Sequence, residues 1–484
     1  MIAVSAAEQV PVHDRRVTAR RMVAAGVALA LAAVTITATT AATGPRGQPR
    51  LSVAGLAQDP CQPQRALPLP AQLSGQFEPD SSMLRVTGGV YAGPGLSAPA
   101  ESACVAATEQ ADRDWLEVGL VPGATATQRS MATRALLDLN LAVRPDGAVQ
   151  AASLPGSGYE YVWPRDSSWV AVALTDTGHP AMAYRILAFL QRMQGSNGIW
   201  AARYAPDGSG PVRDGRPAEL DADGWVPWAV WSWAVTQPLT PGSPSRRELT
   251  QLGPMVVRAA DADASSLTSD GLPAPAMDYW EDSVQVTLGT AAPLLAGLRA
   301  AADLAADLAS DVGRATAASD GRRWAAAAAR LATAITATFG RNGYQRTPSA
   351  GSGADAAVTF LGPPFAVPDA AVLQAARSAQ QELTVPNGGL RPGTSWPGTP
   401  DVTWTPETAF FALFDAATGQ HAQSGALLTW LAAHRTKLGS LPEQVNSAGR
   451  PASVAPLAWT DAVTLLALLA QAGSLPTVPV PAAG

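Results

Sequence analysis

The sequence predicts an all-α domain behind a short N-terminal segment with strand-like patches. From about residue 111 onward, apolar residues recur at three- and four-residue spacing, the period of a helix with one buried face. Nearly half of the 484 residues are apolar and 15% are charged, so a large core can be buried. Long loops rich in Trp, Asp and Glu separate the helical patterns. These observations predict a helical scaffold whose loops form a site at one end.

The first 57 residues are interpreted as a signal peptide or membrane anchor plus linker. Four arginines between positions 15 and 21 precede an apolar, uncharged stretch from Met22 to about Ala42. Its length of about 20 residues is borderline between a cleaved leader and a membrane span. Basic residues hold their side of such a segment in the cytoplasm. We therefore expect the rest of the chain to be secreted, or membrane-anchored outside the cytoplasm.

Composition divides the chain into four parts. Residues 43–70 are rich in Pro, Gly and Gln, which is typical of a linker. Weak strand-like patches such as Met83–Thr87 follow before the helical part begins. The predicted organisation is leader and linker over 1–57, a small N-terminal segment over 58–110, the helical domain over 111–476 and a tail over 477–484.

Two cysteines, Cys61 and Cys104, lie in the N-terminal segment. One disulfide and two free thiols are the alternatives, and export favours the disulfide. No CxxC motif is present and the four histidines are scattered, so we predict neither a metal site nor a cofactor.

Helical patterns follow one another through the rest of the chain, roughly ten to twelve in all. No repeat of fixed short period is visible, which argues against a regular solenoid. The patterns expected to form helices cover residues 128–143, 166–177, 183–193, 224–236, 249–259, 294–308, 324–335, 406–417, 420–434 and 459–472.

Charge and motifs exclude several classes of function. The formal net charge is −6 and no basic stripe is available to meet phosphates, so nucleic acid is not expected as a partner. The P-loop, the dinucleotide fingerprint and the G-x-S-x-G motif are all missing.

The stretch Met277–Ser283 contains the first candidate for chemistry. Glu281 lies between Trp280 and Asp282, just before a helical pattern. Rings and neighbouring carboxylates favour the protonated form of a carboxyl group, which a general acid requires. The alternative is an acidic first turn that stabilises the helix dipole.

The loop Leu438–Val445 contains the second candidate, Glu443, in a turn between Pro442 and Gln444. An ionised carboxylate held there could accept a proton from water. The alternative is a solvated loop carboxylate.

The stretch Gly158–Trp169 contains the third candidate. Aromatic residues precede the pair Arg165 and Asp166, which offers a planar donor fork beside an acceptor pair and so suits vicinal hydroxyls. The alternative is an Asp N-cap with an incidental Arg neighbour. Two carboxylates, an Arg-Asp pair and several Trp together suit sugar hydrolysis, which uses two carboxyl groups and rings that stack on sugars.

In these motifs the chain resembles the glucoamylase-like glycoside hydrolases of family 15. The resemblance runs from about residue 128 to 472 through short blocks in the same order. The blocks are Pro145–Ala152, Gly158–Trp169, Arg216–Trp225, Tyr279–Asp282, Leu441–Val445 and Ala455–Trp459.

The resemblance implies an (α/α)6 barrel and inverting hydrolysis of α-glucosidic bonds from the non-reducing end. It implies that Glu281 is the general acid and Glu443 the general base. Arg165 and Asp166 would hold hydroxyls of the terminal glucose. The remaining substrate-binding residues that it implies are Tyr159, Trp163, Trp280, Asp282 and Trp459. Arg391 matches a contact to the next sugar only loosely.

The chain departs from the family in two ways that affect its substrate. Asp282 stands where many relatives have a second Glu, which could change the preferred leaving sugar. No starch-binding module is recognisable, so we expect short α-glucosides as substrates, with the linkage open. We also expect a monomer. Two alternatives remain, an inactive carbohydrate-binding surface protein on the same barrel and a phosphorolytic enzyme.

Overall fold

The computed structural model describes residues 48–62, 65–312, 314–473 and 475–481. The predicted leader or anchor lies outside these residues. Within them, no helix has both the length and the apolar character needed to cross a membrane.

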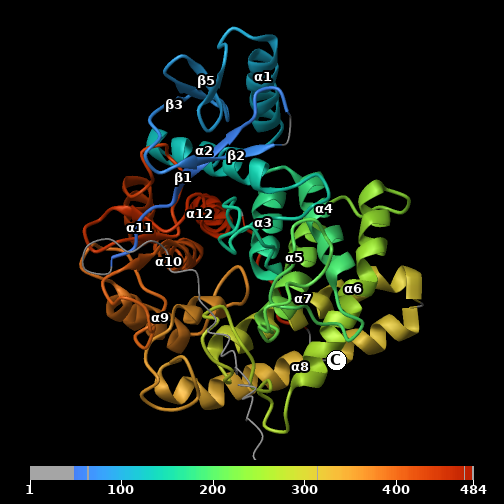
Figure 1. Cartoon of the computed structure of the whole chain (residues 1–484). Helices are drawn as coiled ribbons and strands as arrows, with labels where there is room; N and C mark the ends of the chain where they lie inside the picture. Colours follow the sequence, from blue (N-terminus) through green and yellow to red (C-terminus); the bar gives the residue numbers. More distant parts are fainter. Residues whose placement is uncertain (1–47, 63–64, 313, 474, 482–484) are drawn as a thin grey trace, which may run out of the picture. The chain divides into compact units, whose positions relative to one another are not determined.

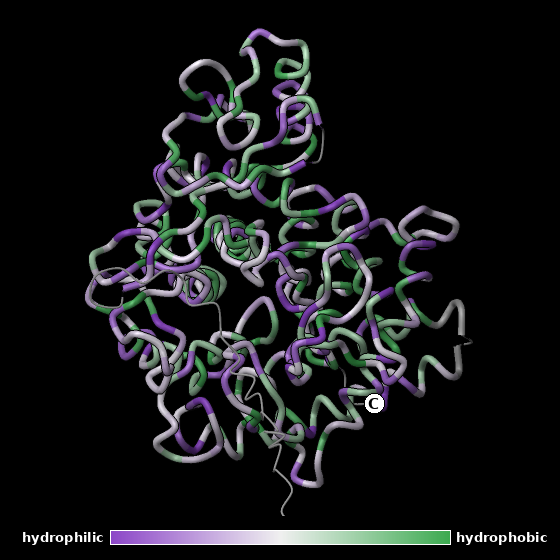
Figure 2. Tube along the Cα trace, viewed as in Figure 1, coloured by the Kyte–Doolittle hydropathy of each residue, from purple (hydrophilic) through white to green (hydrophobic). Residues whose placement is uncertain are grey.

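Six buried segments form the inner wall of the domain (Figure 1). They are α3 (Pro164–Asp176), α5 (Asp221–Val235), α7 (Leu288–Val312), the 3₁₀ segment η3 (Ala356–Leu361), α10 (Thr405–Ala417) and α12 (Ala458–Gln471). Each contacts the next, and α12 contacts α3, so the ring closes. Such helices are apolar all round because no face meets water, and Figure 2 shows hydrophobic colours along α12 at the centre.

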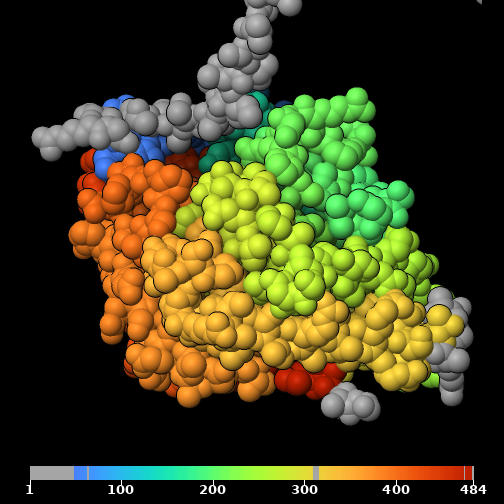
Figure 3. All heavy atoms as spheres, turned by 90° about the horizontal axis from the view of Figure 1, so that it is seen from below, coloured from blue at the N-terminus to red at the C-terminus, as the bar shows by residue number. Residues whose placement is uncertain are grey.

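A second set of helices alternates with the first along the chain and surrounds it. These are α2 (Ala126–Ala142), α4 (Pro180–Met193), α6 (Pro244–Ser266), α8 (Arg314–Thr338), α9 (Ala370–Leu383) and α11 (His421–Ala433). In Figure 3 the golden segment of α8 lies against the yellow-green part of the chain that precedes it. Alternating inner and outer segments make an (α/α)6 barrel, which confirms the predicted fold class.

The parallel inner segments bring their N-terminal ends to one end of the barrel. Glu219 directly precedes α5, the 278–282 turn precedes α7, Asp355 precedes η3 and Glu443 precedes α12. The predicted arrangement of polar loops at one end of a helical scaffold is therefore present.

Two helices and η3 have no counterpart among the predicted patterns. Helix α9 buries mainly alanines, which give only a weak apolar stripe. Helix α1 (Ala103–Val118) buries the polar residues Thr108 and Asp112 on its inner face. The predicted boundary at residue 111 falls inside α1.

Two antiparallel sheets form the N-terminal segment. Strand β1 (Val53–Gln58) pairs with β2 (Ala66–Pro70), and a second sheet has the strand order β3 (Gln76–Phe77), β4 (Leu84–Val86), β5 (Gly89–Gly93) and β6 (Leu96–Ala98). Much of the predicted linker is therefore a hairpin. The alternate residues Leu67 and Leu69 are buried, a two-residue period that the Pro- and Gly-rich composition masks.

The predicted disulfide is present between Cys61 and Cys104, whose Cα atoms are 5.1 Å apart. It joins the loop after β1 to the first turn of α1. A third, short sheet has the order β7 (Thr403–Trp404), β8 (Gln444–Val445) and β9 (Pro451–Ala452). It ties the loop that carries Glu443 to the start of α10.

Candidate active site

The first turn of α3 places Arg165 and Asp166 at the end of the barrel where the loops gather. Helix α3 begins with Pro164, whose fixed φ suits the first helical position, and Asp166 in the first turn complements the helix dipole. Both side chains of the predicted Arg-Asp pair are buried, with the Arg165 Nε 3.3 Å from an Asp166 carboxylate oxygen.

Arg165 connects residues from four parts of the chain. Its guanidinium donates to Glu219 at 2.5 Å, and it lies 3.6 Å from Glu281 and 4.7 Å from the centre of the Trp459 ring. Burial raises the pKa of Asp166 to about 6, against the opposing effect of the Arg165 charge. The buried Asp166 Oδ2 and Arg165 Nε face each other in this ion pair, and neither atom makes a hydrogen bond to any other group of the described residues.

Glu281 lies in the loop before α7 with its side chain partly exposed. Its backbone φ of 55° is left-handed, a strained conformation for a residue with a side chain. The indole Nε1 of Trp163 donates to Glu281 at 3.0 Å, and Arg216 makes a direct ion pair with the same carboxylate.

The surroundings of Glu281 differ from the predicted ones. We expected rings and neighbouring carboxylates, which would favour the protonated form. The structure places the guanidinium groups of Arg216 and Arg165 beside it, and these favour the ionised form. The difference arises because residues adjacent in sequence, such as Asp282, point to other partners. The side chain of Arg216 is 29% exposed, so it has room to move when a ligand enters.

Arg346 holds the loop that carries Glu281. The guanidinium donates to Asp278 at 2.9 and 3.1 Å, to Asp355 at 2.9 Å and to Asp282 at 3.1 Å. It also lies 3.5 Å from the centre of the Trp280 ring. The residues on both sides of Glu281 are therefore fixed to one buried cation.

Glu443 lies in the loop before α12 and is buried. The hydroxyl of Tyr159 donates to its Oε2 at 2.8 Å, and the hydroxyl of Ser453 donates to the same oxygen. Burial raises the pKa of Glu443, while the bonds from Ser453 and Tyr159 lower it. The two hydroxyl donors favour the charged form, which suits a base.

One short segment contacts both predicted catalytic carboxylates. Tyr159 bonds to Glu443, and Trp163, four residues later, bonds to Glu281. The structure thus brings Tyr159, Trp163 and the two glutamates into one site.

The other predicted substrate-binding residues lie around this site in different environments. Trp280 is buried and packs edge to face against Trp396, with ring centres 5.2 Å apart. Asp282 is partly exposed and bonded to Arg346. Trp459 lies under Arg165, in contact with the aromatic core through Phe410.

Several site residues were not identified from the sequence. Arg346 and Ser453 contact the candidate carboxylates or their loops across distant parts of the chain, and no local motif marks them. Glu219 lies inside a matched block but is surrounded there by ordinary loop residues; burial raises its pKa, against the nearby Arg165 charge. Glu407, in the first turn of α10, has its pKa raised by burial to about 8.

No metal site is apparent in the part of the chain that the structure describes. Among these residues, no three His, Cys, Asp or Glu side chains are placed to hold an ion. Asp221 and Asp223 lie in the first turn of α5.

Comparisons with known proteins bear on the fold. No family model matches the chain. An uncharacterized glycosyl hydrolase from Methanocaldococcus jannaschii is 29% identical over 101 residues, which are 21% of this chain but only 16% of that protein.

Solved structures give broader alignments. A glycosidase determined in complex with glucose has a TM-score of 0.55 and 22% identity, over 72% of this chain and 96% of its own. A glucoamylase from Saccharomycopsis fibuligera has a TM-score of 0.52 and 15% identity, over 68% and 89%. A bacterial glucoamylase complexed with acarbose has a TM-score of 0.56 and 16% identity, over 77% and 59%. The chain shares its barrel fold with these proteins.

Proposed function

We propose that the protein is an exported, inverting α-glucoside hydrolase that releases β-glucose from the non-reducing end of short α-glucans or related α-glucosides. The observation that carries the proposal is the segment from Tyr159 to Asp166. Tyr159 at its start bonds to Glu443, Trp163 bonds to Glu281, and the buried Arg165 and Asp166 follow at its end. Glycoside hydrolysis requires two carboxyl groups that flank the scissile bond.

In this mechanism the two carboxylates have different tasks. Glu281, protonated, gives its proton to the glycosidic oxygen as the bond to the leaving sugar breaks. Glu443, ionised, takes a proton from a water molecule that attacks the anomeric carbon from the opposite face. A single displacement inverts the configuration, so an α-glucoside yields β-glucose. Arg165 and Asp166 bind hydroxyls of the glucose and orient it.

The proposal requires Arg216 to move away from Glu281. An ion pair with Arg216 keeps the carboxylate charged, whereas a general acid must enter the reaction protonated. Arg216 comes from the loop before α5 and is partly exposed. A leaving sugar that occupies this position would displace the guanidinium.

The deciding experiment is to incubate the purified protein with maltose, maltotriose, isomaltose and trehalose and to record proton NMR spectra from the first minutes. We expect β-glucose to appear before α-glucose with at least one of them. Glu281→Gln and Glu443→Gln should each lose nearly all turnover with circular dichroism unchanged. A fully active Glu443→Gln protein, or α-glucose as the first product, would rule out this mechanism.

Export is part of the proposal and rests on two features. The arginine-rich start is followed by an apolar stretch, and Cys61 is bonded to Cys104, as is typical outside the reducing cytoplasm. Fractionation of cells that express the full chain would test it, and recovery of the protein in the cytoplasmic fraction would contradict it.

The alternative function is sugar binding without catalysis on the same barrel. It would show as a measurable affinity for one of these saccharides with no product over hours. The hydroxyl donors on Glu443 favour the hydrolase, because a binding site has no need of a charged, buried base.

A further inference from the structure

The N-terminal strand contacts the loop that follows Glu443 through the main chain. The Ser52 N–H donates to the Ser453 carbonyl at 2.7 Å, and the Ser453 N–H donates to the Arg50 carbonyl at 3.0 Å. The Ala455 N–H donates to the Val53 carbonyl at 3.0 Å. These bonds include a parallel β-bridge between Leu51 and Ser453, and we call the three bonds the main-chain clamp.

The clamp acts on a residue whose backbone conformation is unfavourable. Ser453 has a φ of 65°, in the left-handed region, which costs free energy for any residue with a side chain. Its own N–H and its own carbonyl are both in the clamp. In this conformation the hydroxyl bonds to Glu443 and lies 3.3 Å from the Tyr159 hydroxyl.

Strand β1, which continues from the clamp residues, is itself held at several points. Thr436 donates its hydroxyl to the Ala54 carbonyl at 2.6 Å, and Leu438 is buried in a cluster with residues of β1 and β2. The disulfide at Cys61 and the bond from the Thr108 hydroxyl to the Pro60 carbonyl tie the end of the hairpin to α1. Figure 1 shows β1 and β2 beside the C-terminal helices, far away in sequence.

We propose that residues 50–53 are a positioning element of the active site, which sets the Ser453 hydroxyl on the base through the main-chain clamp. This inference rests on the proposed role of Glu443. The N-terminal segment is then part of the catalytic unit. Without the clamp, Ser453 would relax to a negative φ and its hydroxyl would leave the carboxylate.

The test removes one donor of the clamp. Ser52→Pro lacks the N–H that bonds to Ser453, and Ser52→Ala is the matched control because it keeps the N–H and changes only an exposed side chain. The substrate is the α-glucoside that releases β-glucose fastest in the NMR experiment. Small displacements of catalytic groups cost up to about 100-fold in rate, and we expect kcat to fall about tenfold with KM nearly unchanged.

The pH profile separates positioning from general damage. Loss of the Ser453 bond destabilises the ionised form of Glu443 and so raises its pKa. The acid limb of the profile of kcat against pH should therefore move to higher pH in Ser52→Pro and stay in place in Ser52→Ala. Hydrogen exchange at the Ser453 and Ala455 amides should become faster in Ser52→Pro only.

A second pair of variants applies if Ser52→Pro does not fold. Thr436→Val loses the bond to Ala54, and Thr436→Ser keeps it. In Thr436→Val alone, we expect a several-fold lower kcat and an acid limb of kcat that moves to higher pH. Normal kcat and an unmoved limb in the folded clamp variants would overturn the inference while leaving the hydrolase intact. A fully active Glu443→Gln protein would instead remove the proposed function, and this inference with it.

Discussion

At the residue scale, the bond from Ser453 to Glu443 sets the pH dependence of the proposed base. Both hydroxyl donors lower the pKa of Glu443 against the effect of burial. Ser453→Ala removes one donor, so the pKa should rise. A base must be ionised, so activity is lost as pH falls through its pKa, and the acid limb of kcat should move to higher pH.

The matched control for this prediction is Ser447→Ala, an exposed serine in the same loop. It should leave the profile of kcat against pH unchanged. If the acid limb lies at the same pH in Ser453→Ala and in the unsubstituted protein, a group other than Glu443 sets that limb.

Arg346 is the cation that pairs with two fully buried carboxylates beside the loop of Glu281. It bonds to Asp278, Asp355 and Asp282, and the first two of these are fully buried. Arg346→Met would leave the buried carboxylates without their cation, which typically costs about 3–5 kcal/mol. Urea denaturation should show this loss in the free energy of unfolding.

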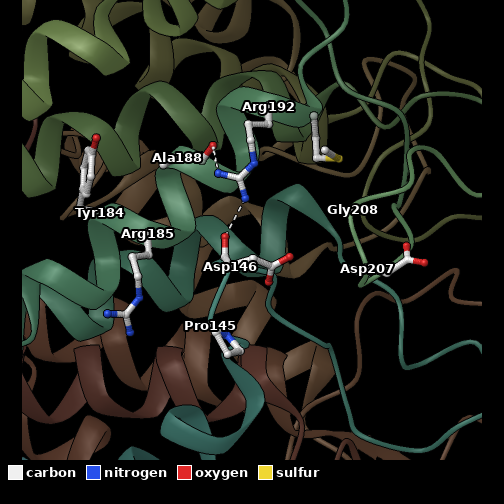
Figure 4. Close-up of a pocket in the computed structure, with 9 residues that line it drawn as sticks. Pro145, Asp146, Tyr184, Arg185, Ala188, Arg192, Asp207 and Gly208 are labelled. Atoms are coloured by element: carbon white, nitrogen blue, oxygen red, sulfur yellow. Dashed lines mark hydrogen bonds between the residues drawn. The ribbon is translucent and has the colours of Figure 1, made fainter. Parts of the chain in front are cut away.

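A surface arginine gives the control for Arg346. Arg185 lines an open pocket of about 610 Å³ on the outer face of α4, together with Pro145, Asp146 and Arg192 (Figure 4). Its side chain is exposed, so Arg185→Met should change the free energy of unfolding by no more than about 0.5 kcal/mol. Equal effects of the two substitutions would contradict the structural role of Arg346.

At the scale of single elements, the two ends of α3 carry aspartates with opposite consequences. Asp166 at the N-terminal end is favoured by the helix dipole, whereas Asp176 closes the C-terminal end, where the dipole opposes a negative charge. Burial raises the pKa of Asp176 to about 7 from an ordinary value of 3.8. Ionisation of Asp176 therefore destabilises the folded state relative to the unfolded state.

This cost predicts how stability changes with pH. The folded state binds a proton at Asp176 that the unfolded state releases, so this residue lowers stability as pH rises from about 4 to about 7. Asp176→Asn removes the effect and should stabilise the protein by roughly 2–4 kcal/mol at pH 8 and very little at pH 4. Urea denaturation at both pH values measures it, and an equal gain at both would show that charge is not the cause.

The elements also show why the sequence predicts some site residues and misses others. Long inner helices and the short blocks around Glu281 and Glu443 have local patterns, so the sequence predicts both. Ser453 and Arg346 act through contacts to residues that are not their sequence neighbours, and η3 is too short to show a period. The charges around Glu281 were misjudged because its closest partner, Arg216, lies 65 positions away in the sequence.

At the scale of the whole molecule, the N-terminal sheets and the barrel should unfold together. They share a buried cluster that includes Leu438, the main-chain clamp, and the bond from the Arg134 guanidinium of α2 to the Ser81 carbonyl at 3.4 Å. Arg134 of α2 also stacks on Phe77, 4.2 Å from the ring centre. Contacts of this kind join the N-terminal segment to the barrel along the described chain, so we expect it not to melt alone.

The disulfide allows this cooperativity to be tested. The bond between Cys61 and Cys104 closes a loop with a sequence separation of 43, for which chain entropy gives about 4 kcal/mol. In the double variant Cys61→Ser and Cys104→Ser, calorimetry should show one transition at a lower temperature, with kcat reduced in parallel at temperatures near it. Two separate transitions, with full activity retained after the first, would mean that the N-terminal segment is an independent domain and that the barrel alone keeps Glu443 in place.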